Sequence, residues 1–105
     1  MTASIDVDKE GFLKNLSDWS ADVASQIAKN EGITLSDDHW EVITILREFY
    51  LTYEISPAMR IFVKRVKEQL GDEKGNSIYL LSLFPGSPAK VASKIAGLPK
   101  PTNCL

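Results

Sequence analysis

The sequence predicts a mainly α-helical protein: a compact helical bundle with a small N-terminal β-hairpin and an extended C-terminal arm. Apolar residues recur at helical spacing between Trp19 and Ala96, and glycine or proline divides this stretch into short segments. The periodicity stops at Gly97, and two prolines follow closely. A chain of 105 residues has room for one core. We therefore expect a single domain over residues 1–97 and a mobile arm over residues 98–105.

The first fifteen residues predict the hairpin. Ile5 and Val7 alternate with acidic residues, the turn-forming stretch 8–11 follows, and Phe12-Leu13 forms the returning strand. Gly11 suits the left-handed conformation that closes such a turn. Because so short a pair of strands is marginal alone, we expect it to pack against helices.

The first helix is predicted from a four-residue repeat. Trp19, Val23 and Ile27 recur at this spacing, Ser17-Asp18 is the predicted N-cap, and Gly32 ends the helix.

The second helix is expected to begin at Ser36-Asp37-Asp38. Asp38 and Glu41 have the spacing of a capping box, and His39 in this first turn is read as a surface or capping residue. The predicted apolar face consists of Trp40, Ile43, Leu46, Phe49, Tyr50 and Tyr53.

The remaining helices are predicted from proline and glycine boundaries. Pro57 breaks the second helix and is expected as the first residue of a third, which ends at Leu70 before Gly71. Two short helices should follow, over Ile78 to Phe84 and Ala89 to Ala96. The residues expected to be buried on the third helix are Ala58, Ile61, Phe62, Val66 and Leu70.

Cys104 is the only cysteine, and it stands next to last, after the two prolines. A free cysteine is most often a small buried apolar residue, but this one lies outside every periodic segment. An exposed thiol is easily oxidised, so this position equally favours a reactive role. Cys104 and His39 alone make neither a disulfide nor a zinc site, so we predict no metal and no cofactor. The chemistry open to such a thiol is to take sulfur from a partner's persulfide and hand it on.

Basic residues are the candidates for supporting the thiolate. Arg60, Lys64 and Lys67 share one face of the third helix, with Arg65 beside it, and Lys100 lies in the arm. One interpretation is a solvated helix face. The other is a basic ledge that receives the arm or an anionic partner, and the residues we predict to dock the arm or support the thiolate are Arg60, Lys64 and Lys100.

Charge and hydropathy limit the classes of partner. The net charge of −2 predicts no general attraction to nucleic acid. The longest apolar stretches are far shorter than the ~20 residues that span a bilayer, and no signal peptide is visible at the start. We therefore expect a cytoplasmic protein without membrane contacts.

Several motifs spread over the whole chain occur together. The C-terminal one runs from Lys94 to Leu105, with cysteine next to last. The others are Val7-Asp8-Lys9-Glu10-Gly11-Phe12-Leu13, Trp19, Trp40-Glu41-Val42-Ile43, Leu46-Arg47, Ser56-Pro57-Ala58-Met59-Arg60 and Leu83-Phe84-Pro85-Gly86. In this combination the chain resembles the DsrC/TusE family of sulfur-relay proteins. The resemblance implies a helical bundle with an N-terminal hairpin, and a sulfurtransferase that carries sulfur as a persulfide on Cys104.

Position 93 distinguishes the two branches of that family. Members that work with dissimilatory sulfite reductase carry a second cysteine eleven residues before the last, where this chain has Ser93. A hydroxyl can form neither a disulfide nor a trisulfide, so Ser93 favours the TusE-like branch. That branch implies a TusBCD-like sulfur donor and an MnmA-like tRNA 2-thiouridylase that modifies the wobble uridine, with tRNA contacted only through this enzyme. In the Pro-x-x-Arg segment, Arg60 is implied to help dock the arm.

Three alternatives stay open. The chain is a DsrC-like partner of dissimilatory sulfite reductase, a helix-turn-helix-like DNA-binding regulator, or a protein that regulates a sulfur enzyme without carrying sulfur. In the DNA-binding alternative, the basic residues of the third helix contact phosphates and Cys104 has no role.

Overall fold

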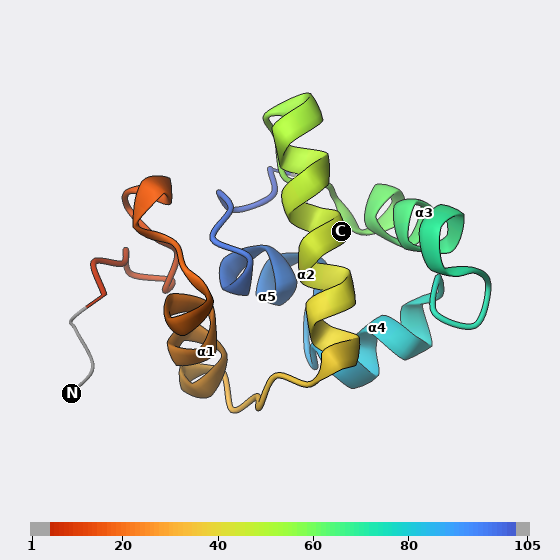
Figure 1. Ribbon diagram of the computed structural model, residues 1–105, viewed down its shortest axis with the longest axis horizontal. Helices are drawn as coiled ribbons and strands as arrows, with labels where there is room; N and C mark the ends of the chain where they lie inside the picture. Colours follow the sequence, from red (N-terminus) through yellow and green to blue (C-terminus); the bar gives the residue numbers. More distant parts are fainter. Residues whose placement is uncertain (1–4, 103–105) are drawn as a thin grey trace.

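Five α-helices and one short 3-10 helix form the described part of the computed structural model, which comprises residues 5–102 (Figure 1). The 3-10 helix is Leu16–Asp18. The α-helices are α1 (Ala21–Asn30), α2 (Asp37–Tyr53), α3 (Met59–Leu70), α4 (Ser77–Leu83) and α5 (Pro88–Ile95). The mainly helical prediction is confirmed, and none of these helices is long and apolar enough to cross a bilayer.

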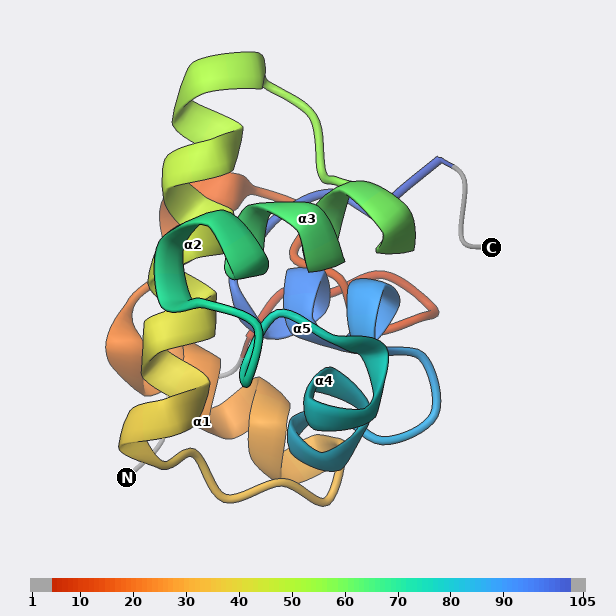
Figure 2. The same ribbon diagram turned by 90° about the vertical axis from the view of Figure 1, so that its right-hand side faces the viewer.

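The short helix α5 lies at the centre of the molecule. It contacts each of the other four α-helices, which surround it in Figures 1 and 2. Its sequence explains this position, because small residues let neighbouring helices approach closely and Ile95 supplies apolar volume. Lys94, which is only 7% exposed, is accepted there because its ammonium lies 3.0 Å from Glu31 Oε2. The helix that leads into the arm is therefore anchored on all sides.

The predicted N-terminal hairpin is wrong as a pair of strands. Within residues 5–102 the segment forms one isolated antiparallel bridge, between Val7 and Leu13, and no strand. The turn itself is present, since the Asp8 carboxylate accepts the backbone N–H groups of Glu10 and Phe12. Side-chain bonding of this kind competes with a ladder, and too few residues remain on either side to extend it.

The starts of the first two helices differ from the prediction. The N-cap of α1 is Ser20, whose Oγ accepts the Val23 N–H at 3.2 Å, so Trp19 lies before the helix. The capping box of α2 joins Ser36 to His39 rather than Asp38 to Glu41. Both carboxylates bind Lys74 instead, at 3.5 and 2.7 Å.

His39 is a capping residue, as predicted, but it is buried rather than on the surface. The Ser36 N–H donates to Nδ1 at 3.1 Å, so the proton is on Nε2, which donates to the Leu83 carbonyl at 2.8 Å. The ring thus joins α2 to α4.

The third helix begins at Met59, with Ala58 as its N-cap, so Pro57 lies outside it. Phe62 and Val66 are buried as predicted, whereas Ile61 is 45% exposed. Ile61 is about 100° around the helix axis from Phe62 and so faces away from the core. This exposed apolar residue lies in the first turn of α3.

Candidate functional site

The predicted sulfur carrier, Cys104, lies outside the described residues, which end at Thr102. The structure does give the path of the chain that leads to it. The candidate site is therefore the surface from which the arm, residues 98–105, departs.

The root of the arm is held by donors to the last carbonyls of α5. The Trp19 indole N–H donates to Ile95 O at 2.9 Å, and Arg47 donates to Ala96 O at 2.6 Å. The Arg47 guanidinium lies over the Trp19 ring, 3.7 Å from its centroid, and burial lowers its pKa below the ordinary value. A helix end with free carbonyls is costly to bury, so these two side chains fix where the arm begins.

The chain turns into the arm at Gly97. Its φ of +75° allows the Leu98 N–H to return to Ser93 O at 2.9 Å, and Leu98 is 2% exposed. A Cβ at Gly97 would lie 2.2 Å from Trp19 Cδ1, so no side chain fits.

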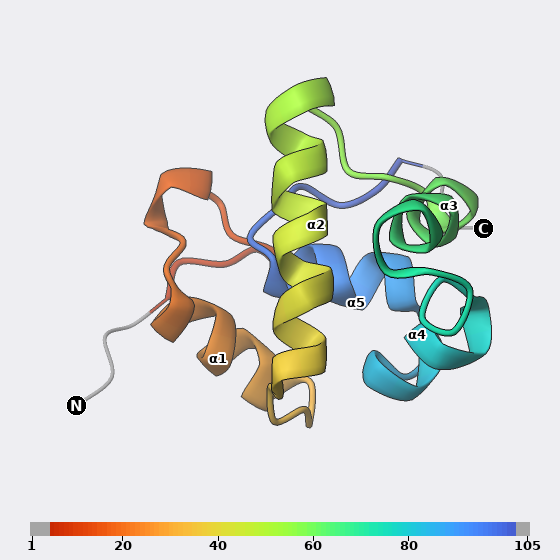
Figure 3. The same ribbon diagram turned by 45° about the vertical axis from the view of Figure 1, so that its right-hand side comes forward.

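Two further contacts fix the arm beyond its root. Ser56 Oγ donates to Pro99 O, which ties the arm to the segment between α2 and α3. Figures 2 and 3 show the arm running beside this segment toward the start of α3. The Lys100 ammonium lies 3.0 Å from both carboxylate oxygens of Glu10, and Pro101 is buried. Residues 98–101 are thus packed on the domain, whereas the mobility of the whole arm stays a prediction.

Glu10 connects three parts of the chain. Its carboxylate binds Lys100 of the arm and, at 2.9 Å, Lys90 of α5, while its backbone belongs to the N-terminal turn. Hydrogen bonds from Lys90 and Lys100 lower the pKa of this carboxyl from 4.5 to about 2. The pKa of Glu10 is lower in the folded state than in the unfolded state, so its ionised carboxylate stabilises the fold. This stabilisation is complete above pH 4.5 and is lost as the pH falls toward 2. At neutral pH the contact is therefore intact.

We expect Glu10→Gln to loosen the arm at neutral pH, because the amide cannot hold two ammonium groups. The measurement is the amide-nitrogen heteronuclear NOE of Lys100 and Thr102, which should fall. Asp6→Asn is the matched control, since it removes another exposed pair, with Lys14, that does not involve the arm. Equal NOE values in the two variants would mean that Glu10 does not restrain the arm.

The predicted basic ledge is partly present. Arg60 and Lys64 are exposed on α3, and within residues 5–102 neither forms an ion pair. Arg65 instead turns toward α2, where it donates to the Tyr53 hydroxyl at 3.1 Å. Lys100 is paired with Glu10, which also binds Lys90. Roles for Arg60, Lys64 and Lys100 at the thiolate stay predictions.

Ser93 lies on α5 and is completely buried. Its Oγ has no hydrogen-bond partner in the described part of the chain, and a buried unpaired hydroxyl is unfavourable. We expect Ser93→Ala to raise the free energy of unfolding by up to about 1 kcal/mol. Denaturant unfolding measures this, with Ser82→Ala as control, because Ser82 Oγ is exposed and bonded to Tyr79 O at 2.6 Å. If Ser93→Ala lowered the free energy of unfolding by more than the control does, the Ser93 hydroxyl could not be unpaired.

Sequence reasoning missed the side chains that hold the arm: Glu10, Trp19, Arg47 and Ser56. The four-residue repeat predicts Trp19 on the apolar face of a helix, and the other three residues have no periodic signal. All four, however, stand in the motifs that carried the family resemblance. The motifs were therefore a usable signal for residues that no local pattern picks out.

Comparison with known proteins shows which family the chain resembles over its whole length. The family model described as "DsrC like protein" matches residues 1–105. The chain belongs to the DsrC-like family. It is 55% identical over 101 residues to the sulfurtransferase TusE of Escherichia coli K12, covering 96% of this chain and 93% of that one. It is 56% identical over 101 residues to the TusE of Sodalis glossinidius, covering 96% and 94%. Full-length relatives with this name support a role in sulfur relay.

Solved structures show that the DsrC-like fold extends over nearly the whole chain. The NMR structure of Allochromatium vinosum DsrC superposes with a TM-score of 0.85 at 54% identity, covering 94% of this chain and 88% of that one. The oxidised DsrC γ-subunit of the dissimilatory sulfite reductase from Archaeoglobus fulgidus gives 0.83 at 38% identity, covering 96% and 92%. Identity to the TusE chains and to A. vinosum DsrC is nearly equal. Overall sequence identity therefore does not distinguish the TusE-like branch from the branch that works with dissimilatory sulfite reductase. The residue at position 93 remains the feature that distinguishes them.

Proposed function

We propose that this chain is a sulfurtransferase that accepts sulfur as a persulfide on Cys104 and passes it to an MnmA-like tRNA 2-thiouridylase. The observation that carries the proposal is a single, next-to-last cysteine in a chain about 55% identical, over nearly its full length, to proteins named sulfurtransferase TusE.

The proposed chemistry needs one thiol and no redox partner. The Cys104 thiolate attacks the outer sulfur of the donor's persulfide, the donor's S–S bond breaks, and the donor cysteine leaves as a thiolate. An acceptor thiolate then attacks the outer sulfur now on Cys104, which leaves as a thiolate in turn. One sulfur atom moves at each step, and no electrons are gained or lost overall.

Positive charge near Cys104 favours its thiolate. Lys100 is the nearest cation in sequence, but its ammonium is already paired with Glu10, which also binds Lys90. Arg60 and Lys64, which form no ion pair within residues 5–102, are therefore the stronger candidates for thiolate support and arm docking.

The partners in this proposal are a TusBCD-like donor complex and the thiouridylase, in the cytoplasm. The net charge of −2 agrees with contact to tRNA only through the enzyme. The contacts of Arg65 argue against the DNA-binding alternative, since this residue turns away from the proposed phosphate-contacting face toward Tyr53.

A DsrC-like role with dissimilatory sulfite reductase is the second candidate, because identity to A. vinosum DsrC is 54%. Ser93 argues against it, since the chain has no second thiol with which Cys104 can pair.

The test of the proposed function is reconstituted formation of 2-thiouridine in tRNA. The mixture contains a cysteine desulfurase, a TusBCD-like complex, the thiouridylase, tRNA and ATP. We expect product only when this chain is added. Equal product with and without the chain would overturn the proposal.

A further inference from the structure

We infer that the sulfur-accepting protein docks on the surface around the start of α3, and that it presents carboxylates around an apolar patch. We call this the exit surface; it consists of Ile55, Arg60, Ile61 and Lys64. The inference rests on the proposed function of Cys104 and adds the place and chemistry of its partner's contact.

The fixed part of the arm limits where a partner can meet the thiol. Leu98, Pro99 and Lys100 are each bonded to the domain, and Pro101 is buried. Cys104 is the third residue after Pro101, and three extended residues span at most about 11 Å. An arm free from Gly97 onward would instead reach about 25 Å. While these contacts hold, a protein that takes sulfur from Cys104 must cover the surface close to Pro101.

The start of α3 is one of the surfaces beside this point. Ser56, which bonds Pro99, lies between Ile55 and the helix, and the arm runs toward the first turn of α3 (Figures 2 and 3). Arg60 and Ile61 belong to that turn, and Lys64 follows Arg60 by one helical turn. Three of the four residues thus belong to the segment and the first turn that the arm approaches, and Lys64 lies one turn further along α3.

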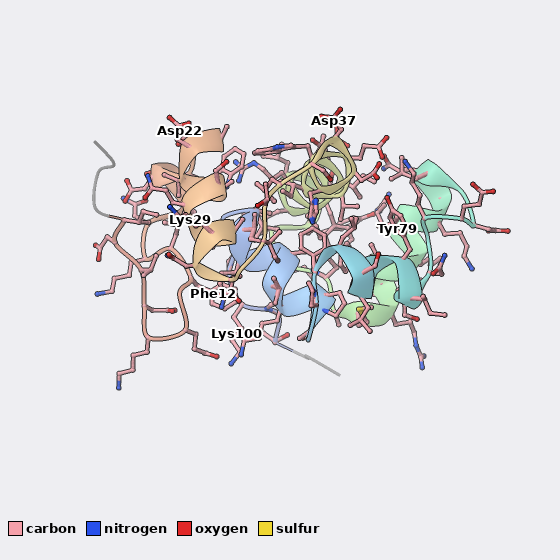
Figure 4. All side chains as sticks on the ribbon, turned by 90° about the horizontal axis from the view of Figure 1, so that it is seen from below. Phe12, Asp22, Lys29, Asp37, Tyr79 and Lys100 are labelled. Carbon is pink, nitrogen blue, oxygen red and sulfur yellow. The ribbon has the colours of Figure 1, made fainter. Side chains whose placement is uncertain are left out.

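The exit surface combines exposed apolar area with unneutralised positive charge. Ile55 is 61% exposed and Ile61 45% exposed. Arg60 and Lys64 are exposed and lack an ion pair within the described residues, unlike Lys90 and Lys100, which share Glu10. Figure 4 shows Lys100 on the side of the molecule opposite Asp22 and Asp37, the acidic starts of α1 and α2.

A protein fits this surface better than RNA does. Two exposed isoleucines gain nothing against a phosphate backbone, whereas they bury well against an apolar protein patch. Carboxylates at the rim of that patch would pair with Arg60 and Lys64 and speed the encounter.

The test measures binding of the full-length chain, with Cys104→Ser to prevent transfer, to a purified MnmA-like thiouridylase without tRNA. The apolar variant is Ile55→Ser with Ile61→Ser. Its matched control is Ile78→Ser with Leu81→Ser, because these α4 residues are similarly exposed, at 83% and 47%. The charge variant is Arg60→Gln with Lys64→Gln. Its control is Lys29→Gln, an exposed α1 cation without an ion pair in residues 5–102.

We expect each exit-surface variant to raise Kd about tenfold or more, and the controls to change it less than about twofold. The charge variant should also reduce the salt dependence of binding. An unchanged Kd in both exit-surface variants would overturn the inference. It would also be overturned if the chain bound tRNA alone and the charge variant abolished that binding. Sulfur loading of the same variants, with Cys104 intact, distinguishes a failure of the docking inference from a failure of the proposed function. If Cys104 loads normally but Kd does not respond, the docking inference alone fails. If Cys104 never loads, the proposed function fails.

Discussion

Replacement of Cys104 by serine is expected to abolish sulfur transfer while leaving the fold intact. Serine cannot hold a persulfide, and the chain has no second cysteine to take over. Cys104 follows the two prolines, outside every periodic segment, and substitutions away from a core change stability by less than about 0.5 kcal/mol. For a domain of this size that corresponds to a change in Tm below about 4 °C.

Two measurements on Cys104→Ser check this expectation. The amount of sulfur passed to the thiouridylase should fall to the level found without the chain, and a thermal melt should match the parent. A melting temperature lower by much more than this limit would show that the thiol is packed in the core. The carrier proposal would then lose its main support from the sequence.

The second large effect is expected at the root of the arm. Gly97→Ala places a Cβ 2.2 Å from Trp19 Cδ1 and 2.6 Å from Cγ, and it forces alanine to a φ of +75°. Trp19 cannot move away freely, because Ile95 O and the Arg47 guanidinium hold its ring. We expect a loss of about 2–5 kcal/mol in the free energy of unfolding, seen as a fall in Tm of roughly 10 °C or more.

Gly86→Ala is the matched control for Gly97→Ala. Gly86 also has a positive φ, +93°, but a Cβ there meets nothing within 4 Å. The control should lose only the conformational term, about 1–2 kcal/mol. If the two variants unfold at the same denaturant concentration, Trp19 moves aside without lowering the free energy of unfolding, and the root of the arm is not closely packed.

Periodicity predicted the helices well because their apolar faces are local features of the sequence. Phe62 and Val66, one helical turn apart, are both buried as predicted. Boundaries were harder, because a cap depends on which polar side chain wins the first free N–H groups. Ser20 rather than Ser17-Asp18 caps α1, and His39 rather than Glu41 completes the box of α2. The hairpin failed for the same local reason, since Asp8 bonds the backbone that a ladder would need.

The path of the arm could not be predicted from local pattern, because residues far apart in the sequence fix it. Trp19 and Ile95 are 76 positions apart, and Glu10 and Lys100 are 90 apart. Neither pair has a spacing that sequence periodicity can detect. The two prolines correctly ended the helical pattern, but they did not indicate that Leu98 is buried against the domain.

Intact-mass analysis of the full-length chain tests the central claim most directly. The chain is incubated with a cysteine desulfurase, its substrate cysteine and a TusBCD-like complex, and its mass is then recorded without reductant. The account predicts a gain in steps of one sulfur atom, which reductant removes and which Cys104→Ser does not show. No gain in the parent chain, or a gain that persists in Cys104→Ser, would contradict it.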